Sequence, residues 1–555
     1  MEQGRVVIAI ALSLAVFLIW SFFFAEKTPI KEEDRPSRVQ DKAESSAKIA
    51  QPIAVPGSSA PGKTTKPDTT IRPPKPPRTI EIDTPLYLLN ISEDGARVRH
   101  FDLKDYRETV EKDSPRKSLV SGKNPHGALW VGNGGQGLFG VESPLFTANI
   151  LSDKVVVTDQ AADVVFSWTS PQGAIVEKRF RFEPKTYLID MTITIKNGSD
   201  TLLQNPLSIS LTKPIGEEGG KAYGFEGPSA LMDKKVERIE IKKIKENSNY
   251  SGNIKWMAIQ DRYFISTLIP KEAQKAQMNL VVRENNILEA QYLMPSVAIE
   301  PGMEQHFEYQ LFLGPKNTRI LKEAGYDLEK AIDFGMFDFI AKPCVWLMNF
   351  LYGFIPNYGV AIIILTLLSK ILLWPLGNKS YKSMSEMKRL QPLLSEIREK
   401  YKNDKKKVQQ ETMNLYKTYK INPLGGCLPM VAQIPVFFAL YRMLYEAIEL
   451  RHAPFFGWIN DLSAPDRLFR FGFSIPFMEP PHGIPVLTIV MGATMLLQQK
   501  MSPPPGDPGQ AKMMMLMPIV FTFIFINFSS GLVLYWLVNN ILSIAQQYYV
   551  TKKTA

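Results

Sequence analysis

Cysteine and histidine are scarce in this chain of 555 residues, which contains two cysteines, Cys344 and Cys427, and five histidines. Two cysteines cannot form a disulfide framework, and we expect these two on opposite faces of a membrane, where no disulfide could join them. His100, His126 and His306 do not lie at metal-ligand spacing from another His, Cys or carboxylate pair. They are interpreted as ordinary surface or core histidines, and no metal site is expected.

The sequence also lacks a nucleotide-binding loop. Gly377-Asn378-Lys379-Ser380 has no glycine at the first position that G-x-x-x-x-G-K-[ST] requires. Gly132, Gly134 and Gly137 fit G-x-G-x-x-G, but no helix is expected after them, so we interpret them as a flexible glycine loop. No carboxylates cluster at a spacing that would indicate hydrolysis. We therefore predict a protein that is not an enzyme and uses no cofactor.

Aromatic residues are absent from residues 26–79, which contain ten prolines. Such a segment cannot bury enough apolar surface to fold, so it is predicted to be a disordered, proline-rich linker. Before it, Val6 to Ala25 is an apolar run of 20 residues, long enough for a hydrocarbon core of ~30 Å. A cleaved signal peptide is the alternative, but Phe22-Phe23-Phe24-Ala25 is a poor cleavage site. We predict an uncleaved transmembrane anchor over residues 1–25, with its amino terminus inside.

Alternating apolar and polar residues dominate residues 80–325. The alternation is clear from Ile189 to Lys196, where the turn signal Asn197-Gly198 follows, and it returns at Leu207–Leu211 and Phe307–Leu313. Many short strands between turn signals are typical of a β-sandwich. This part of the chain is predicted to be an all-β domain outside the membrane.

Residues 326–352 are predicted to form an amphipathic helix on the outer membrane surface. Lys342-Pro343 is expected to interrupt this helix. The proposed apolar face consists of Ile332, Met336, Phe339 and Ile340.

The most informative apolar run is Gly359 to Leu376, which carries one cation, Lys370, in its inner half. A charge in a membrane helix costs ~2.5–3.5 kcal/mol at the centre, so we expect Lys370 to face protein or water. Snorkelling of Lys370 to the inner interface, ~9 Å along the helix axis, is the alternative. Thr366 lies four residues before Lys370 and therefore shares its helix face.

Four further apolar cores, of 15, 14, 16 and 14 residues, are Cys427–Tyr441, Ile484–Leu497, Met513–Phe528 and Leu532–Ala545. Each is shorter than the ~20 residues of a full span. With the anchor and the run around Lys370 they predict six transmembrane helices, five of them in a core over residues 353–555. Polar residues inside these cores need partners or water, although contacts between helices would also satisfy them. They are Gln433, Thr488, Thr494, Asn527, Asn539, Asn540 and Ser543.

Residues 377–422 carry twelve Lys or Arg and five Asp or Glu, a net charge of +7. A basic loop between membrane segments marks the cytoplasmic side, and nucleic acid is the alternative partner for such a patch. We predict an antiparallel helical hairpin here, with Pro392 kinking its first arm, while a solvated connector is the alternative. The heptad positions of the first arm are Met387, Leu390, Leu394, Ile397 and Tyr401.

Five stretches of this half carry a family resemblance. They are Trp374-Pro375-Leu376, Gln391-Pro392, Asn422-Pro423-Leu424-Gly425-Gly426-Cys427, Asp461-Leu462-Ser463-Ala464 and Gly531-Leu532-Val533-Leu534-Tyr535-Trp536. In this order, after an anchor, a linker and an exported domain, they resemble the YidC membrane-protein insertase family in its Gram-negative form. The resemblance implies a multi-domain, polytopic α-helical membrane protein with an all-β periplasmic supersandwich domain. Ser529 departs from the pattern, since the family usually has proline there.

The resemblance also implies a mechanism and a set of residues. Small inner-membrane proteins would be inserted and folded through a hydrated groove, alone or with the Sec translocon. We predict in addition that the hairpin residues Met387, Leu390, Leu394 and Ile397 capture these clients first. The groove residues that match the family are Lys370, Thr366 and Trp536, and we predict Gln433 as a fourth from its place inside an apolar core.

The implied partners are nascent membrane proteins, the Sec translocon, the ribosome, the signal recognition particle machinery and the lipid bilayer. The implied location is the bacterial inner membrane, with both termini cytoplasmic and the large domain periplasmic. Two other classes stay open at this point. A transporter or channel would also place a cation inside a membrane helix. A membrane-anchored, sugar-acting enzyme would need clustered carboxylates in the exported domain.

Overall fold

The structure is a computed structural model that describes residues 76–122, 127–134, 137–215, 224–244, 248–272, 274–283, 286–419, 428–502 and 508–554. The predicted anchor, almost all of the predicted linker, His126 and Cys427 lie outside the described residues.

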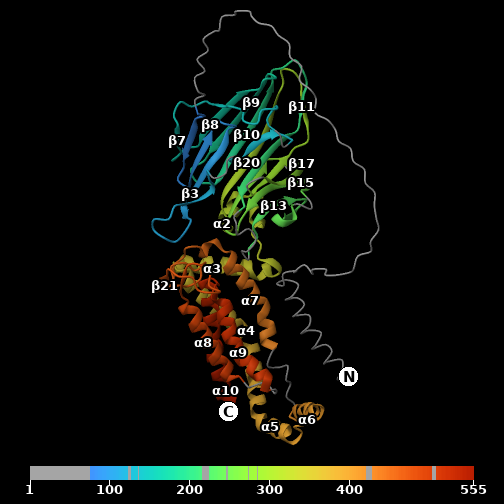
Figure 1. The fold of residues 1–555 in the computed structure, drawn as a ribbon, viewed down its shortest axis with the longest axis vertical. Helices are drawn as coiled ribbons and strands as arrows, with labels where there is room; N and C mark the ends of the chain where they lie inside the picture. Colours follow the sequence, from blue (N-terminus) through green and yellow to red (C-terminus); the bar gives the residue numbers. More distant parts are fainter. Residues whose placement is uncertain are drawn as a thin grey trace, which may run out of the picture. The chain divides into compact units, whose positions relative to one another are not determined.

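Two large sheets build the β domain (Figure 1). The smaller sheet has the order β4-β3-β2-β1-β7, with β1 at Thr79–Asp83, β2 at Tyr87–Ser92, β3 at Arg97–Arg107, β4 at Arg116–Val120 and β7 at Lys154–Val156. The larger sheet follows the path β5-β12-β18-β17-β15-β16-β20-β10-β9-β8-β6, with β13 and β14 paired beside β15. Its strands are β5 (Trp130–Asn133), β6 (Thr147–Ala148), β8 (Ala162–Thr169), β9 (Ala174–Phe182), β10 (Leu188–Asn197), β12 (Leu207–Pro214), β13 (Gly227–Met232), β14 (Lys235–Arg238), β15 (Asn249–Gln260), β16 (Phe264–Pro270), β17 (Gln274–Arg283), β18 (Ile287–Leu293) and β20 (Glu304–Pro315). A separate pair joins β11 (Leu203–Asn205) to β19 (Val297–Ile299).

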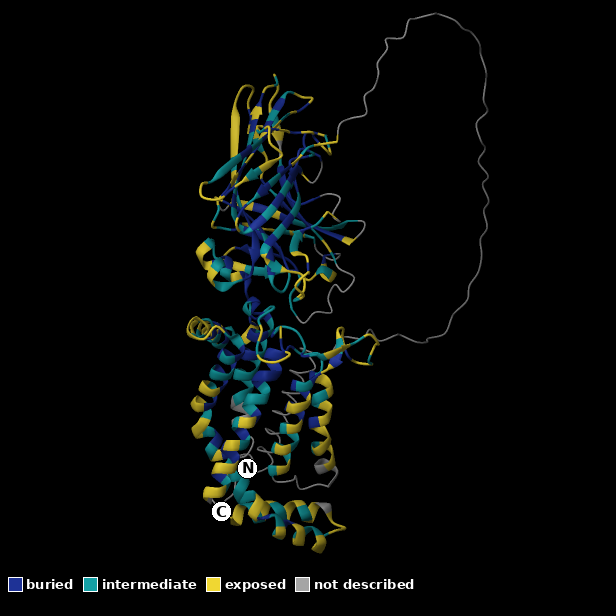
Figure 2. Ribbon diagram, turned by 90° about the vertical axis from the view of Figure 1, so that its left-hand side faces the viewer, coloured by how far each residue is buried: buried dark blue, intermediate teal, exposed yellow. Residues whose placement is uncertain are grey.

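The strand β10 shows why the alternation in the sequence predicts this domain. Its apolar residues Ile189, Met191 and Ile193 are buried, while the residues between them are half-buried. β10 pairs antiparallel with β9 on one side and β20 on the other, so every second side chain enters the core. Figure 2 shows this buried interior between the exposed strand ends. The predicted β-rich domain with sandwich-like sheets is confirmed.

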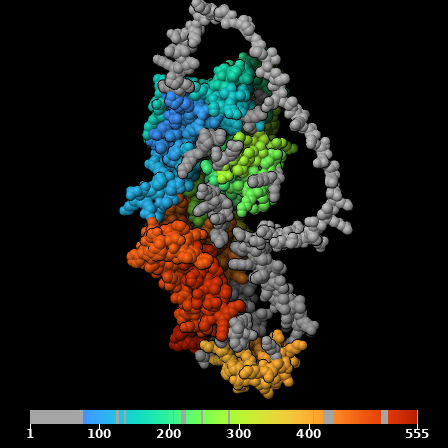
Figure 3. Space-filling model, in the orientation of Figure 1, coloured from blue at the N-terminus to red at the C-terminus, as the bar shows by residue number. Residues whose placement is uncertain are grey.

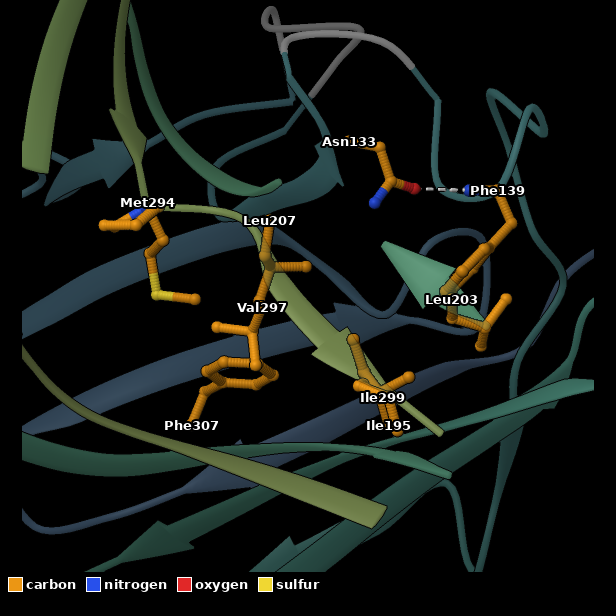
Figure 4. A pocket seen from close by; sticks show the side chains of 10 residues that line it. Asn133, Phe139, Ile195, Leu203, Leu207, Met294, Val297, Ile299 and Phe307 are labelled. Atoms are coloured by element: carbon orange, nitrogen blue, oxygen red, sulfur yellow. Dashed lines mark hydrogen bonds between the residues drawn. The ribbon is translucent and has the colours of Figure 1, made fainter. Parts of the chain in front are cut away.

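Of the predicted glycine loop, Gly132 lies inside β5 and pairs with Ser208, and residues 135 and 136 lie outside the described residues. No helix begins at Gly137, and Asn133 accepts a hydrogen bond at Oδ1 from the backbone N of Phe139 at 2.6 Å. Next to it lies an apolar pocket, lined by Leu203, Leu207 and Phe307 among others, that has room for about one water molecule (Figure 4). The pocket is too small for a sugar or a nucleotide.

The segment after the β domain differs from its prediction. The short helix α2 (Thr318–Ala324) is followed by 3-10 turns η3 (Leu328–Ala331) and η4 (Gly335–Phe337), and the helix α3 runs over Asp338–Phe354. The predicted helix over residues 326–352 therefore begins twelve residues late, because Asp327 and Gly335 adopt positive φ angles that no helix accepts. Pro343 lies inside α3 near its start, where it removes only one hydrogen bond. The proposed apolar face is not formed, since Ile332 is buried and Met336 precedes the helix.

After α3, the described residues include the helices α4 (Tyr358–Arg389), α7 (Leu428–Glu446), α8 (Val486–Met501), α9 (Pro508–Phe525) and α10 (Ser530–Thr554). Among the described residues, α4 alone is long and apolar enough to cross a membrane by length and composition. Exposed apolar side chains lie on α4, α8 and α9, and include Leu372, Val490 and Phe523. The number of membrane spans stays a prediction.

The boundary between the first of these helices and the hairpin also differs from the prediction. α4 continues without a break through Pro375 and Gly377 to Arg389, rather than ending at Leu376. Pro392 stands in the first turn of a new helix, α5 (Gln391–Lys400), and does not kink an existing one. After a turn, α6 (Lys405–Thr418) begins at the cap Asp404, whose side chain accepts from the N of Lys407 at 3.0 Å. The side chains of α5 and α6 are grouped together in Figure 3, coloured orange.

The motif Asp461-Leu462-Ser463-Ala464 has a structural role that its sequence does not reveal. Asp461 accepts at Oδ1 from the backbone N of His452 and of Ser463, which shapes the loop. The loop then supplies acceptors to the start of α10: Ser530 N donates to the Ala464 carbonyl at 2.7 Å, and Gly531 N donates to the Leu462 carbonyl at 2.9 Å. These bonds satisfy the free amides of the first turn of α10 and fix where this helix begins.

Candidate functional site

A cavity of about 690 Å³ lies among α4, α7, α8, α9 and α10. Its wall carries many polar groups, and seven of them are side-chain amides. The polar residues that line it are Lys370, Ser380, Tyr381, Gln433, Gln498, Gln499, Ser502, Tyr535, Asn539, Asn540, Ser543, Gln546 and Gln547. Such groups in an apolar bundle need partners inside the protein or from whatever enters the cavity.

Lys370 is the cation of this cavity, and its side chain is 9% exposed. Its Nζ donates to Ser543 Oγ at 2.6 Å and to Asn539 Oδ1 at 3.4 Å. In the part of the chain that the structure describes, no carboxylate pairs with it. The amine therefore lies inside the bundle against neutral oxygens of α10, and does not extend to the inner end of α4 as in snorkelling.

Asn539 links three helices at this point. Its Oδ1 also accepts from Gln433 Nε2 at 2.9 Å, so Lys370 of α4 and Gln433 of α7 meet on one oxygen of α10. Ser543 Oγ donates to the Asn539 backbone carbonyl at 2.6 Å, which leaves its lone pairs for Lys370. Asn539 and Ser543 were noted in the sequence only as polar residues in an apolar core. Their spacing of four, continued by Gln546 and Gln547, was the available signal for one polar face of α10.

Trp536 lines the cavity one turn before Asn539 and belongs to an aromatic wall. Its ring meets Phe437 at a centroid distance of 4.8 Å and Phe525 at 4.5 Å, both edge to face. Along α10 the cavity therefore changes from aromatic at Trp536 to amide at Gln546. A single helix thus offers both an apolar and a polar surface to the same space.

Thr366 is placed elsewhere by the structure. Its side chain is fully buried and donates from Oγ1 to the carbonyl of Ile362 at 2.7 Å, one turn earlier in α4. It is not among the residues that line the cavity. Three of the four groove residues named from the sequence, Lys370, Gln433 and Trp536, are therefore brought together, and Thr366 is not.

The other end of the cavity is shaped by Gly377. Gln546 Nε2 donates to the Trp374 carbonyl at 3.1 Å and to Asn378 Oδ1 at 3.0 Å. A Cβ atom on Gly377 would lie 2.7 Å from the same nitrogen, so a larger residue would displace Gln546. Gln547 also lines the cavity and is buried, and its Oε1 has no hydrogen-bond partner among the described residues.

The four hairpin residues named from the sequence do not share one surface. Met387 still belongs to α4 and lines the cavity. Leu390 and Leu394 are buried, and Ile397 is half-buried. The larger apolar side chains that α6 and its end expose are Met413 and Tyr419.

Comparisons with known proteins identify the family. The family model described as 60Kd inner membrane protein matches residues 350–555, and that of the YidC periplasmic domain matches residues 79–347. The membrane protein insertase YidC of Syntrophus aciditrophicus is 40% identical over 563 residues, which cover 99% of each chain. The chain belongs to the YidC family of membrane protein insertases. The YidC of Syntrophobacter fumaroxidans is likewise 40% identical, over 99% of this chain and 100% of its own.

A solved structure of an active YidC insertase, with its first transmembrane domain resolved, is 19% identical and covers 85% of this chain and 94% of its own, with a TM-score of 0.37. Membership of the YidC family makes this protein an inner-membrane insertase that is not an enzyme, as the sequence predicted. The readings as a transporter, a channel or a sugar-acting enzyme are set aside.

Proposed function

We propose that the cavity around Lys370 receives the polar segment of a client protein while the client's apolar segment enters the bilayer. The observation that carries this proposal is the environment of Lys370, a buried cation whose hydrogen-bond partners are the neutral oxygens of Asn539 and Ser543. A buried charge without a counter-charge is costly to keep, which favours a role in binding an anionic group. An acidic residue of the client would supply that group.

The energetics fit a protein that lowers a barrier without consuming a nucleotide. Burial of the client's apolar segment releases ~25 cal/mol per Å², and this term drives insertion. The obstacle is the client's polar tail, because each unpaired polar group costs ~2–7 kcal/mol in an apolar medium. Amides such as Gln433, Asn540 and Gln547 offer hydrogen bonds to that tail, and Lys370 offers a charge. The membrane potential adds ~2.3 kcal/mol per charge per 100 mV.

The arrangement of the chain across the membrane is part of the proposal. The anchor and the five core helices would give six spans, with both termini and the basic hairpin in the cytoplasm and the β domain in the periplasm. The net charge of +7 over residues 377–422 supports this orientation. The Sec translocon, the ribosome and the signal recognition particle machinery are the proposed partners, on the strength of the family resemblance.

Cysteine labelling tests this orientation. With Cys344 and Cys427 replaced by serine, a single cysteine at Asn403 should react with an impermeant thiol reagent only from the cytoplasm, and one at Asn460 only from the periplasm. Asn460 is exposed, whereas its neighbour Asp461 holds the loop before α10 and is unsuitable. Labelling is measured in intact cells and in inverted membranes. The opposite pattern would overturn the proposed topology.

Site-specific cross-linking tests whether the client enters the cavity. Met514 lines the cavity, whereas its neighbour Met515 is 61% exposed and does not line it. A photo-reactive phenylalanine analogue at Met514 should cross-link a stalled single-span client several-fold more strongly than the same analogue at Met515. Both variants lie on α9 and are compared at equal protein levels. Stronger cross-linking from Met515 would place the client on the outer face of α9 and contradict the proposal.

A further inference from the structure

Asn527 is a polar residue in an apolar stretch, and the proposed function does not use it. It lies just beyond the end of α9, where its side chain forms hydrogen bonds with a loop that is distant in the sequence. Asn527 Oδ1 accepts from the backbone N of Glu479 at 2.9 Å, and Asn527 Nδ2 donates to the carbonyl of Phe477 at 2.9 Å. The loop between β21 (Leu468–Phe471) and β22 (His482–Ile484) is thereby tied to α9.

Arg467 makes the same connection from the other side of the loop. Its Nη1 donates to the carbonyl of Ile526 at 2.8 Å, and its Nε donates to the carbonyl of Pro481 at 2.9 Å. Together with the two bonds of Asn527, these bonds hold residues 472–481 in one position relative to the end of α9.

The loop and the strand β21 before it expose three phenylalanine residues. The exposed fraction is 90% for Phe477 and 64% for Phe473 in the loop, and 69% for Phe469 in β21. Phe477 and Phe469 have φ angles of 64° and 51°, a left-handed conformation that is rare for bulky residues. Phe473 stacks on Phe471 at a centroid distance of 5.2 Å. A fixed loop that keeps aromatic rings exposed in a strained backbone indicates a surface that something covers.

The neighbouring surface indicates what covers it. The apolar side chains of Ile519, Val520, Phe523 and Ile524 are exposed on α9, the helix that the loop is tied to. In a protein of the inner membrane, such a helix face meets lipid. Phe477 lies just beyond the end of this helix, because its carbonyl accepts from Asn527, while Glu479 and Arg470 in and beside the loop are exposed and polar. An apolar surface edged by charge suits the boundary between acyl chains and headgroups.

We propose that Phe469, Phe473 and Phe477 form an aromatic anchor that lies in the interfacial zone of the lipid bilayer at the end of α9. The anchor sets the depth of α9, and α9 supplies Met514, Met517 and Phe521 to the wall of the cavity. This proposal depends on the membrane location of the protein and not on the role proposed for Lys370, so either can fail without the other.

Fluorescence quenching in vesicles tests the anchor. The full chain, with Cys344 and Cys427 replaced by serine, carries an environment-sensitive fluorophore on Phe477→Cys and is reconstituted into phosphatidylethanolamine–phosphatidylglycerol vesicles. Nitroxide-labelled lipids quench from a known depth, and iodide on both sides of the membrane quenches from water. We expect strong quenching by a headgroup-level nitroxide, weaker quenching by one near the bilayer centre, and little quenching by iodide.

Leu151→Cys is the matched control, because Leu151 is an apolar residue of the β domain that is 100% exposed. Its probe should be quenched by iodide and not by lipid. Phe473→Cys provides a second probe, which should match Phe477→Cys in depth. If both loop probes behave like the probe at Leu151, the loop extends into water and the proposal fails. If both are shielded from lipid and iodide alike, another protein surface covers the loop, and the proposal fails as well.

Discussion

Lys370→Glu is expected to reduce insertion of a client with an acidic outer tail by tenfold or more. Two like charges about 4 Å apart repel by ~4 kcal/mol at an effective dielectric constant of 20, and ~1.4 kcal/mol corresponds to a tenfold change. The structure strengthens this expectation, because Lys370 is the cation that lines the described cavity and it has no carboxylate partner there. A glutamate in its place would face an incoming carboxylate at close range.

Other substitutions of Lys370 should form a graded series. Lys370→Arg keeps the charge and can still donate to Ser543 and Asn539, so it should retain activity. Lys370→Ala removes the charge without adding repulsion, so its insertion activity should lie between those of Lys370→Arg and Lys370→Glu. Insertion of acidic-tailed clients should decrease more than that of neutral-tailed clients. The series therefore separates the role of charge from that of packing.

The measurement uses the purified protein reconstituted alone and a pair of single-span clients that differ only in tail charge. Lys388→Glu is the matched control, since Lys388 is exposed near the end of α4 and outside the cavity, and it undergoes the same change of charge. Equal losses for both clients would mean that Lys370 supports the fold or polarity of the cavity without contacting client charge. Unchanged insertion in every variant would exclude Lys370 from the process.

Removal of the hairpin is expected to leave a folded protein that binds clients poorly. The structure shows where the deletion should begin. α4 extends to Arg389, and Met384 and Met387 line the cavity. A deletion that begins at Lys382 would therefore damage the cavity itself. Replacement of Gln391–Thr418 by a short Gly-Ser bridge removes α5 and α6 and keeps α4 whole. Most of the basic surface and the exposed Met413 are lost with these helices.

Binding of a fluorescent client and its insertion rate are measured for the deletion at matched protein levels, with the thermal unfolding midpoint as the check on folding. A control variant with Met413→Ser and Tyr419→Ser keeps the hairpin but removes its exposed apolar side chains. Weaker binding in the deletion alone would assign capture to the basic charges, and weaker binding in both would assign it to the apolar surface. A normal insertion rate in the deletion would make the hairpin a connector.

Local pattern was sufficient to predict several elements of this protein, although it misplaced the start of α3 and the end of α4. The alternation in β10 predicts a strand with one buried face, because its period of two is that of the pleat itself. The apolar run around Lys370 predicts a membrane helix with one costly residue, because a charge inside such a run needs a partner or water whatever the partner is. The heptad residues and the turn near Asp404 likewise predict two helical arms; α5 and α6 form them, although Met387 of the predicted first arm belongs to α4.

Tertiary structure alone decided which helix faces contact one another. Asn539 and Ser543 lie 169 and 173 residues after Lys370, and no local pattern specifies that their oxygens receive its amine. Thr366 shares a helix face with Lys370, yet a hydrogen bond to Ile362 satisfies it outside the cavity. Gly377 was expected to begin the hairpin, but it lies inside α4. Glycine is needed there because the side chain of Gln546, from α10, packs closely against it. Periodicity determines the face that a helix presents, whereas the partner on that face depends on how all five helices pack.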